Sequence, residues 1–419
     1  MTPGPDQKWR DTTPVQTPVA SDTTIKAISD LAATAGLQHV HMLAWRDLDD
    51  DEAGGSEVHA HNIASIWAQS GLQVTMRTSA AAGQPTTTVR EGYTVSRKAG
   101  RYGVFPRSAL AEISGRLGPC DGLIEIWNGM PFWSPLWWRG PRAIWLHHVH
   151  GPMWGQTLSA PLAKVGVTLE ERIAPPLYRH QPMVTLSPSS RAEMIDDLGF
   201  DADKVTVITP GVDPFFSPGG TRSPTPLAVA VGRLAPVKDF PRLVRLMAGA
   251  RRRVPDLELV IVGEGSERDT ILATVAEHGA SEWVHLVGRV SDEELRELYR
   301  RAWVASSAST REGWGMTLTE AAACGTPTVA TDISGHSDAV DAGRSGLLAS
   351  SDEDLIELLV RVMTDDGLRA QLQEGALARA AELGWEHTAL ANFEVLAGDA
   401  IRRHGGPRAA GSPHGEHRS

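Results

Sequence analysis

The segment EGWGMTLTEAAACGTPTVATD, residues 312–332, decides the fold class. It opens with a glycine-rich loop that leads into a helix-forming run beginning near residues 316–317, and Gly325 followed by a proline marks the end of that helix. Apolar runs at residues 303–307 and 326–331 flank the loop and the helix. This order of strand, glycine loop, helix and strand predicts a unit of a parallel α/β sheet.

The same alternation of apolar runs and helix-like segments extends along most of the chain. Nearly continuous apolar character is typical of strands that are buried on both faces of a parallel sheet. The segment 209–226 contains five prolines and separates two such halves. We therefore predict an α/β protein with two doubly wound, Rossmann-like domains that face each other across a cleft. The expected strands are residues 39–45, 72–78, 122–127, 143–146, 183–187, 204–209, 227–232, 257–263, 284–288, 303–307 and 326–331.

Composition sets the expected domain limits. The polar, proline-rich segment 1–24 and the tail 405–419 are expected to be disordered. Residues 25–212 are expected to form the N-terminal domain and residues 213–384 the C-terminal domain. A last helix, residues 385–404, has a pattern that fits either domain.

Charge and cysteine content exclude several classes of protein. The 419 residues are 41% apolar and carry a formal net charge of -11, which argues against nucleic acid as a partner. Only two cysteines occur, Cys120 and Cys324, far apart and without metal-ligand spacing, which indicates a reducing compartment. The N-terminus does not resemble a signal peptide, and no apolar run approaches the roughly 20 residues of a membrane helix. We expect a cytoplasmic protein.

Two carboxylates lie on either side of the loop–helix junction in the opening segment. In open α/β sheets, ligands bind beyond the carboxyl ends of the strands. Gly313, Gly315 and the first N–H groups of the helix would form an anion site there that suits a diphosphate. Glu312 could accept hydrogen bonds from sugar hydroxyls, and Glu320, about one turn into the helix, could hold a ribose diol. The alternative is a glycine turn with a solvated glutamate on each side.

Two cations follow another predicted strand, in VGRLAPVKDF (231–240). Arg233 could bind a pyrophosphate with two parallel hydrogen bonds and Lys238 as a point charge. The alternative is a pair of surface cations.

A third glycine-containing turn, DLDDDEAGGSEVHAH (47–61), precedes a predicted helix that Ser56 could cap and Gly71 could end. The acids at 47–52 could bind a divalent metal, but they lack ordered ligand spacing, and we expect a solvated, mobile loop. His59 and His61 cannot share a helix face, which argues against a zinc pair.

Three histidines, at 147, 148 and 150, follow the strand at 143–146. A metal site is conceivable there, but no acid or cysteine of matching pattern is near in sequence. We expect His147 to line the cleft and to hydrogen-bond substrate or phosphate.

Taken together, these segments resemble the retaining GT-B glycosyltransferases of family GT4 over residues 38–404. The E-x7-E element with its following helix is the most specific part of the resemblance. The other matching motifs are GGSEVH (54–59), VTLSPSSRAEM (184–194), VITPGVD (207–213), VGRLAPVK (231–238), LVIVGEG (259–265) and VHLVGRVSDEEL (284–295).

The resemblance implies that the N-terminal domain serves the acceptor and the C-terminal domain binds a nucleotide-sugar donor. It also implies that the helix 385–404 crosses back to the N-terminal domain. Glu312 and the backbone amides of residues 313–317 would bind the sugar and diphosphate, and Gly55 would close on the donor from the other domain. The implied catalytic residues are Glu312, His147, Arg233 and Lys238. The implied donor-binding residues are Gly55, Val290 beside the base, Gly313, Trp314, Gly315, Met316, Thr317 and Glu320.

The implied reaction needs neither metal nor cofactor, because two cations and a helix dipole can stabilise the leaving diphosphate. We therefore expect a hexose to move from a donor such as UDP-glucose or GDP-mannose to an acceptor hydroxyl with retention of configuration. Two departures from the family pattern are His336 and Asp338, which stand where the family often has a glycine pair and a glutamate. Alternatives are a non-catalytic nucleotide-sugar-binding protein and a GT-B sugar-nucleotide epimerase.

The acceptor side is marked by six tryptophans within residues 127–154 and four basic residues within 97–107. The adjacent Trp137 and Trp138 cannot both face inward on a regular strand. Basic and aromatic surface suits an anionic membrane or a lipid-phosphate acceptor, with peripheral contact at the inner membrane face. A carbohydrate-stacking wall and plain core packing are equally open, and the acceptor could be a sugar, a lipid-linked or a small molecule.

Overall fold

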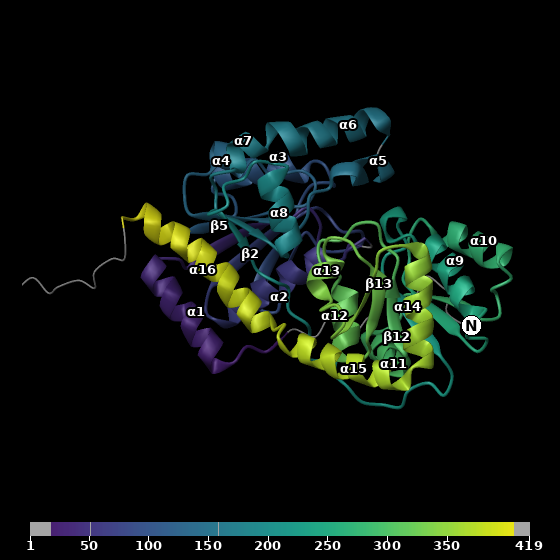
Figure 1. Ribbon diagram of the computed structural model, residues 1–419. Helices are drawn as coiled ribbons and strands as arrows, with labels where there is room; N and C mark the ends of the chain where they lie inside the picture. The colour runs from purple at the N-terminus through teal and green to yellow at the C-terminus, as the bar shows by residue number, and fades with distance from the viewer. Residues whose placement is uncertain (1–17, 51, 158, 406–419) are drawn as a thin grey trace, which may run out of the picture.

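The computed structural model describes residues 18–50, 52–157 and 159–405. Two open sheets, one in each half of the chain, confirm the predicted fold of two doubly wound α/β domains (Figure 1). The first sheet has the strand order β3-β4-β2-β1-β5-β6-β7-β8, and the second has the order β11-β10-β9-β12-β13-β14. All neighbouring strands pair in parallel except β3 with β4.

The strands of the N-terminal domain are β1 (His39–Leu43), β2 (Gln73–Thr78), β3 (Thr87–Arg90), β4 (Tyr93–Arg97), β5 (Gly122–Trp127), β6 (Arg142–Leu146), β7 (Met183–Thr185) and β8 (Val205–Val207). Its helices are α1 (Asp22–Ala35), α2 (Gly55–Gln69), α3 (Val104–Ile113), α4 (Ser134–Trp137), α5 (Trp154–Thr157), α6 (Ala160–Thr168), α7 (Pro175–Tyr178) and α8 (Pro188–Asp196), with short helical turns η2 (Gly151–Met153) and η3 (Leu169–Ile173).

The strands of the C-terminal domain are β9 (Leu227–Val231), β10 (Glu258–Val262), β11 (Val284–Gly288), β12 (Val304–Ser307), β13 (Thr328–Thr331) and β14 (Gly346–Ala349). Its helices are α9 (Phe240–Arg251), α10 (Arg268–Glu277), α11 (Asp292–Arg301), α12 (Met316–Ala323), α13 (His336–Ala339), α14 (Asp352–Thr364) and α15 (Asp366–Ala381), with the turn η4 (Pro236–Lys238). The last helix is α16 (Trp385–Arg403).

Helix α16 leaves the C-terminal domain and packs on the N-terminal one, against α1, α2, β5 and β6 (Figure 1). Phe393 and Leu396 are fully buried there, and the Phe393 ring meets the ring of Trp67 edge-on at 5.4 Å. The Trp67 indole N–H donates to the carbonyl oxygen of Ala389 at 2.9 Å. Each large apolar side chain buried in this way stabilises the fold by about 1.5–3 kcal/mol. The N-terminal core is thus completed by the end of the chain.

The N-terminal boundary of ordered structure differs from the expected one at residue 24. Ser21 caps α1, which begins at Asp22, because its hydroxyl accepts a hydrogen bond from the Thr24 N–H. The Glu386 carboxylate on α16 accepts from the Ser21 N–H at 3.1 Å. Disorder is therefore wrong for residues 18–24, and residues 1–17 and 406–419 lie outside the described residues.

The start of α2 also differs in its cap. We expected Ser56 to cap the helix, but α2 begins one residue earlier, at Gly55, and Gly54 takes the N-cap position. The Glu57 carboxylate accepts the Gly54 N–H at 2.8 Å, which is the half of a capping box that the third helical residue provides, and glycine has no side chain to provide the other half.

Candidate active site

The β12–α12 loop, residues 308–315, follows a strand near the middle of the C-terminal sheet. Helix α12 begins at Met316, within the predicted range, and Gly315 precedes it with φ 111°, a conformation that favours glycine. A Cβ atom on Gly335 would lie 2.6 Å from the carbonyl oxygen of Glu312, and one on Gly313 would lie 3.0 Å from that of His147. The loop is therefore fitted closely between α13 and the end of β6 in the other domain.

Glu312 is held by two groups of its own domain. Lys238 Nζ lies 2.5 Å from Glu312 Oε1, and the Ser309 hydroxyl donates to the same oxygen at 2.8 Å. Burial raises the pKa of Glu312, but Lys238 and His336 outweigh burial and hold that pKa below its usual value. The structure thus brings together Glu312 and Lys238, which lie 74 residues apart in the chain, as an ionised pair.

His336 lies against this pair and is buried. Its Nδ1 is 2.9 Å from the carbonyl oxygen of Thr331, and burial lowers its pKa. Asp338 has a different role, because its carboxylate accepts the Gly335 N–H at 3.3 Å and the hydroxyl of Ser189 on α8. The two departures from the family pattern therefore support the Glu312 site and the contact between the domains.

Arg233 lies on the domain boundary. Its Nη1 is 3.4 Å from the carbonyl oxygen of Glu52 in the N-terminal domain, and the side chain is exposed. Glu312 acts on it electrostatically, as do Arg46 and Glu57 from the N-terminal domain. A guanidinium held at the domain boundary near Glu312 can reach an anionic ligand bound between the domains.

The start of α2 faces the start of α12. A Cβ atom on Gly55 would lie 2.8 Å from Met316 Sδ, which shows how closely the two helix N-termini approach. Both ends carry partial positive charge and unpaired N–H groups. Thr317 is half-buried in the first turn of α12. The arrangement therefore suits an anion that lies between the two domains.

Trp314 contributes differently from the other residues of this loop. Its side chain is 3% exposed and packs with Leu186, Val212 and Ala339, so only its backbone is available to a ligand. Arg379 lies over its ring at 5.8 Å. Trp314 thus anchors the loop in the core while its neighbours Gly313 and Gly315 set the path of the backbone.

Glu320 lies in an acidic and half-buried place on α12. The Tyr299 hydroxyl donates to Glu320 Oε2 at 3.1 Å. The pKa of Glu320 is raised to about 8, mainly by burial and in part by the nearby carboxylates of Asp292 and Asp213. The sequence prediction missed these three partners, which come from α11 and from the segment between the domains. Val290 packs in the same cluster as Tyr299 and so lies on the same side as Glu320.

His147 is placed at the end of β6 with its ring 4% exposed. The ring packs edge-on against His59 at 4.8 Å and lies parallel to the Trp145 ring at 6.5 Å. Neither ring nitrogen has a hydrogen-bond partner within the described part of the chain. Burial holds the pKa of His147 well below its usual value, so the imidazole is neutral and can still donate one hydrogen bond and accept one.

Part of the acidic loop before α2 is buried in ion pairs, whereas Asp49 and Glu52 are exposed. Asp47 is fully buried, and one of its carboxylate oxygens accepts hydrogen bonds from Arg90 and Arg97, each at 3.0 Å. Asp49 pairs with the same two arginines at 2.6 and 2.5 Å. The expectation of a solvated loop was wrong for Asp47, because its neutralising arginines lie on β3 and β4, two strands that the sequence pattern did not reveal.

Most tryptophans of segment 127–154 serve packing. Trp127 and Trp145 are fully buried, and the indoles of Trp137 and Trp138 donate to carbonyl oxygens of Phe132 and Pro141, each at 2.9 Å. Both of these adjacent tryptophans are half-buried, which their position around the end of α4 allows.

Solved structures with the same arrangement are glycosyltransferases. The chain superposes on a sucrose-phosphate synthase of Thermosynechococcus elongatus with a TM-score of 0.72 and 19% identity, covering 88% of this chain and 99% of that one. Anabaena Alr3699/HepE in complex with UDP and glucose gives a TM-score of 0.69 and 18% identity, covering 86% of this chain and all of that one. The fold is the GT-B fold, and the class of protein is a glycosyltransferase.

Sequence comparison identifies the family within this class. A family model described as "Glycosyl transferases group 1" matches residues 213–379, and one described as "Glycosyltransferase Family 4" matches residues 53–215. The D-inositol 3-phosphate glycosyltransferase of Stackebrandtia nassauensis is 30% identical over 84% of this chain and 88% of its own length. That of Salinispora arenicola is 28% identical over 87% and 92%. The chain belongs to the GT4 family of glycosyltransferases.

No helix among the described residues combines the length and the apolar character that crossing a bilayer requires.

Proposed function

We propose that this glycosyltransferase moves a hexose from a nucleoside-diphosphate sugar to an acceptor hydroxyl with retention of configuration and without a metal ion. The observation that carries this proposal is the Glu312–Lys238 ion pair beside the facing N-termini of α2 and α12. One structural relative, Anabaena Alr3699/HepE, was solved with UDP and glucose and also with UDP-glucose, which supports a donor of that type.

The donor diphosphate is proposed to bind between the two helix N-termini. Negative charge grows on this group as the bond to the sugar breaks, and Lys238 and Arg233 then stabilise it. Because these charges are fixed in place before the reaction, they can do the work of a metal ion. Glu320 would accept hydrogen bonds from the ribose hydroxyls, and the adjacent Val290 would contact the base.

Glu312 is proposed to orient the sugar. Its second carboxylate oxygen can accept hydrogen bonds from sugar hydroxyls while Oε1 is held by Lys238 and Ser309. His147 would meet the sugar from the other domain, and its unpartnered ring nitrogens would gain a hydrogen bond when the donor is present. The acceptor hydroxyl would attack from the side of the leaving diphosphate, whose oxygen takes the hydroxyl proton as the glycosidic bond forms.

The acceptor is proposed to be a small hydroxylated molecule that binds in the N-terminal domain. The polar side chains of Arg46 and Asn128 lie there beside the start of α2. The named relatives act on D-inositol 3-phosphate, which favours a polyol or polyol phosphate over a protein or nucleic-acid acceptor.

A cytoplasmic location with peripheral membrane contact is part of the proposal. Leu110, Ile113 and Leu136 on α3 and α4 are 57–64% exposed, and Arg107 and Arg116 beside them are exposed cations. Such a surface suits anionic lipid headgroups. Co-sedimentation with vesicles that contain anionic lipid tests this point, and equal binding to neutral vesicles would contradict it.

The experiment that tests the proposed function is a nucleotide-release assay in EDTA with single donors, including UDP-glucose and GDP-mannose. A transferase hydrolyses its own donor slowly even without acceptor, so one nucleotide should accumulate and an added polyol phosphate should accelerate its release. Glu312→Gln should abolish this acceleration while thermal-shift binding of the donor persists. Donor binding without turnover in the wild type would favour a non-catalytic sugar-nucleotide-binding protein. Release of a changed sugar nucleotide instead of a free nucleotide would favour an epimerase.

A further inference from the structure

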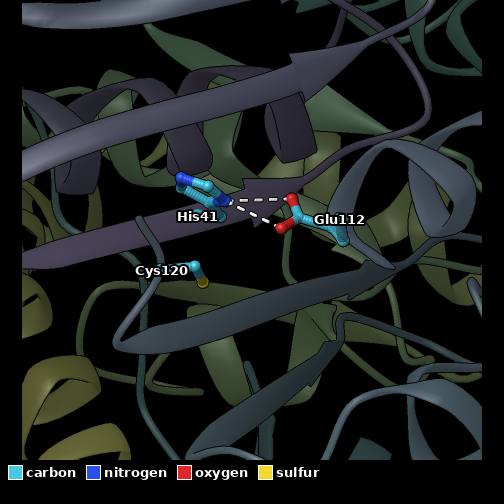
Figure 2. A group of neighbouring side chains, drawn as sticks. All are labelled: His41, Glu112 and Cys120. Carbon is cyan, nitrogen blue, oxygen red and sulfur yellow. Dashed lines mark hydrogen bonds and ion pairs between the residues drawn. The ribbon is translucent and has the colours of Figure 1, made fainter. Parts of the chain in front are cut away.

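A second group of polar side chains lies outside the proposed active site, on the face of the N-terminal sheet near α3. His41 is on β1, Glu112 is in the last turn of α3, and Cys120 is on the loop that leads into β5 (Figure 2). Each residue therefore comes from a different element. None of them takes part in the reaction proposed above.

The three side chains converge. His41 Nδ1 lies 3.0 and 2.9 Å from the two carboxylate oxygens of Glu112, and Figure 2 shows the ring and the carboxylate turned toward each other with Cys120 beside them. One ligand atom from each of the three residues lies within 4.8 Å of the others. The side chains of His41 and Glu112 are each 2% exposed. Cys120 is partly buried beside them, so the set differs from the exposed carboxylate clusters that are common on protein surfaces.

The kinds of ligand atom select the metal. Imidazole, carboxylate and thiolate together are ligands of Zn²⁺, whereas Mg²⁺ and Ca²⁺ take oxygen ligands. Zinc bonds of about 2.0–2.3 Å place tetrahedral ligand atoms roughly 3.3–3.7 Å apart. The three ligand atoms lie within 4.8 Å of one another, so zinc would draw them together by at most about 1 Å.

Charge favours the same metal. A thiolate, a carboxylate and a neutral imidazole carry a charge that Zn²⁺ balances, so the completed site would be neutral. Neutrality matters because the side chains of His41 and Glu112 are almost fully excluded from water, and an unbalanced charge is costly in such a buried place. Zinc binding would release the proton of the Cys120 thiol and break the hydrogen bond between His41 and Glu112. A water molecule could serve as the fourth ligand of the tetrahedral metal.

We propose that His41, Glu112 and Cys120 bind a zinc ion that ties α3 to β1 and to the loop before β5. The site lies apart from Glu312 and Lys238, so the role of the metal is structural, and the proposal does not depend on the donor or the acceptor. The sequence pattern could not reveal it, because His41 and Glu112 are 71 residues apart.

Cobalt(II) substitution provides the test, since cobalt takes the same tetrahedral ligands and a cobalt–thiolate bond absorbs in the near ultraviolet. The full chain, treated with chelator and dialysed, is titrated with Co²⁺. We expect this charge-transfer band to saturate at one equivalent and to disappear when Zn²⁺ is added. The chain contains only two cysteines, so a band must come from Cys120 or Cys324.

Matched cysteine variants identify the ligand. Cys120→Ser should remove the band, and Cys324→Ser should retain it. Removing even an outer hydrogen-bond partner of a ligand costs about 10–100-fold in metal affinity, so Glu112→Gln should weaken Zn²⁺ binding by at least about tenfold. The melting temperature of the wild type should rise with Zn²⁺, and that of Cys120→Ser should not, although the two should melt alike in chelator.

Three results would overturn the proposal. They are the absence of a thiolate band in the wild type, a band that survives Cys120→Ser, and a zinc-induced rise in melting temperature that is equal in both proteins. Histidines of the C-terminal tail do not confuse the result, because cobalt bound by imidazole alone gives no thiolate band. If donor turnover fails while the cobalt band appears, the proposed function is wrong and the zinc site stands.

Discussion

Nucleotide binding at Glu320 is expected to release a proton. Burial raises the pKa of this carboxyl to about 8 in the free protein, with Asp292 and Asp213 adding to the effect, so Glu320 is mostly protonated at pH 7. Ribose hydroxyls that donate hydrogen bonds to the carboxylate favour its charged form. The bound state should therefore bring the pKa of Glu320 back toward its ordinary value of 4.5.

The size of this effect follows from the distance between the pKa and the working pH. At pH 7, one unit below the raised pKa, loss of the proton costs about 1.4 kcal/mol, which corresponds to about tenfold in affinity. At pH 9 the proton has already left the free protein, and the cost is close to zero. Donor affinity should thus rise about tenfold from pH 7 to pH 9, with release of about 0.9 proton per donor bound at pH 7.

Isothermal titration calorimetry at pH 7 in two buffers with different ionisation enthalpies measures the released proton directly. The nucleotide sugar identified by the release assay is the right probe, because its diphosphate does not titrate in this range. Glu320→Gln is the matched control and should bind with little dependence on buffer or pH. Equal heats in both buffers for the wild type would refute the reasoning, as would an unchanged pH dependence in Glu320→Gln.

Three further changes test other parts of the structure. Lys238→Ala removes the cation that pairs with the carboxylate at 2.5 Å and should lower turnover in the release assay by about 10²–10³-fold, whereas the exposed Lys26→Ala should leave it unchanged. Gly335→Ala would place a Cβ atom 2.6 Å from a carbonyl oxygen of the β12–α12 loop at φ 86°, and should lower both stability and turnover. Gly36 has φ 69°, and no atom lies within 4 Å of the place where a Cβ would stand. Gly36→Ala should therefore lower the free energy of unfolding in urea by about 1 kcal/mol without loss of turnover. Burial lowers the pKa of His59 to about 3, so its imidazole stays neutral in the folded protein at pH 5, whereas in the unfolded protein it gains a proton below pH 6.5. This difference should lower the free energy of unfolding by about 2 kcal/mol at pH 5 relative to pH 8. His59→Phe should reduce this dependence of stability on pH, as measured by urea unfolding.

Parts of the fold that depend on local pattern could be predicted from the sequence. The apolar runs located β6, β9 and β10 because strands buried on both faces are apolar along nearly their whole length. The start of α12 was predicted because glycine must precede it at positive φ. In contrast, β3 is a short edge strand whose alternating exposure leaves only a weak apolar signal, and β4, which is paired between β3 and β2, is a short run of mostly polar residues, YTVSR.

The sequence allowed several residues of the site to be predicted, but not the side chains with which they form hydrogen bonds and ion pairs. Glu312 and Lys238 were each proposed from a loop at a strand end, and the topology of the sheet then brings these loops together. The burial of Asp47 could not be predicted, because its partners Arg90 and Arg97 lie on β3 and β4, which the apolar pattern of the sequence did not reveal. Similarly, the raised pKa of Glu320 comes mainly from its burial and then from two acids in distant segments, neither of which local spacing reveals.

The return of α16 to the N-terminal domain has a consequence for biosynthesis. The first domain leaves the ribosome with the apolar surface around Trp67 uncovered, and residues 213–384 must be made before Phe393 and Leu396 can cover it. During that interval the nascent chain exposes an apolar surface that a chaperone would bind. The second domain can fold on its own strands in the meantime, so the half that is translated first should be the half that matures last.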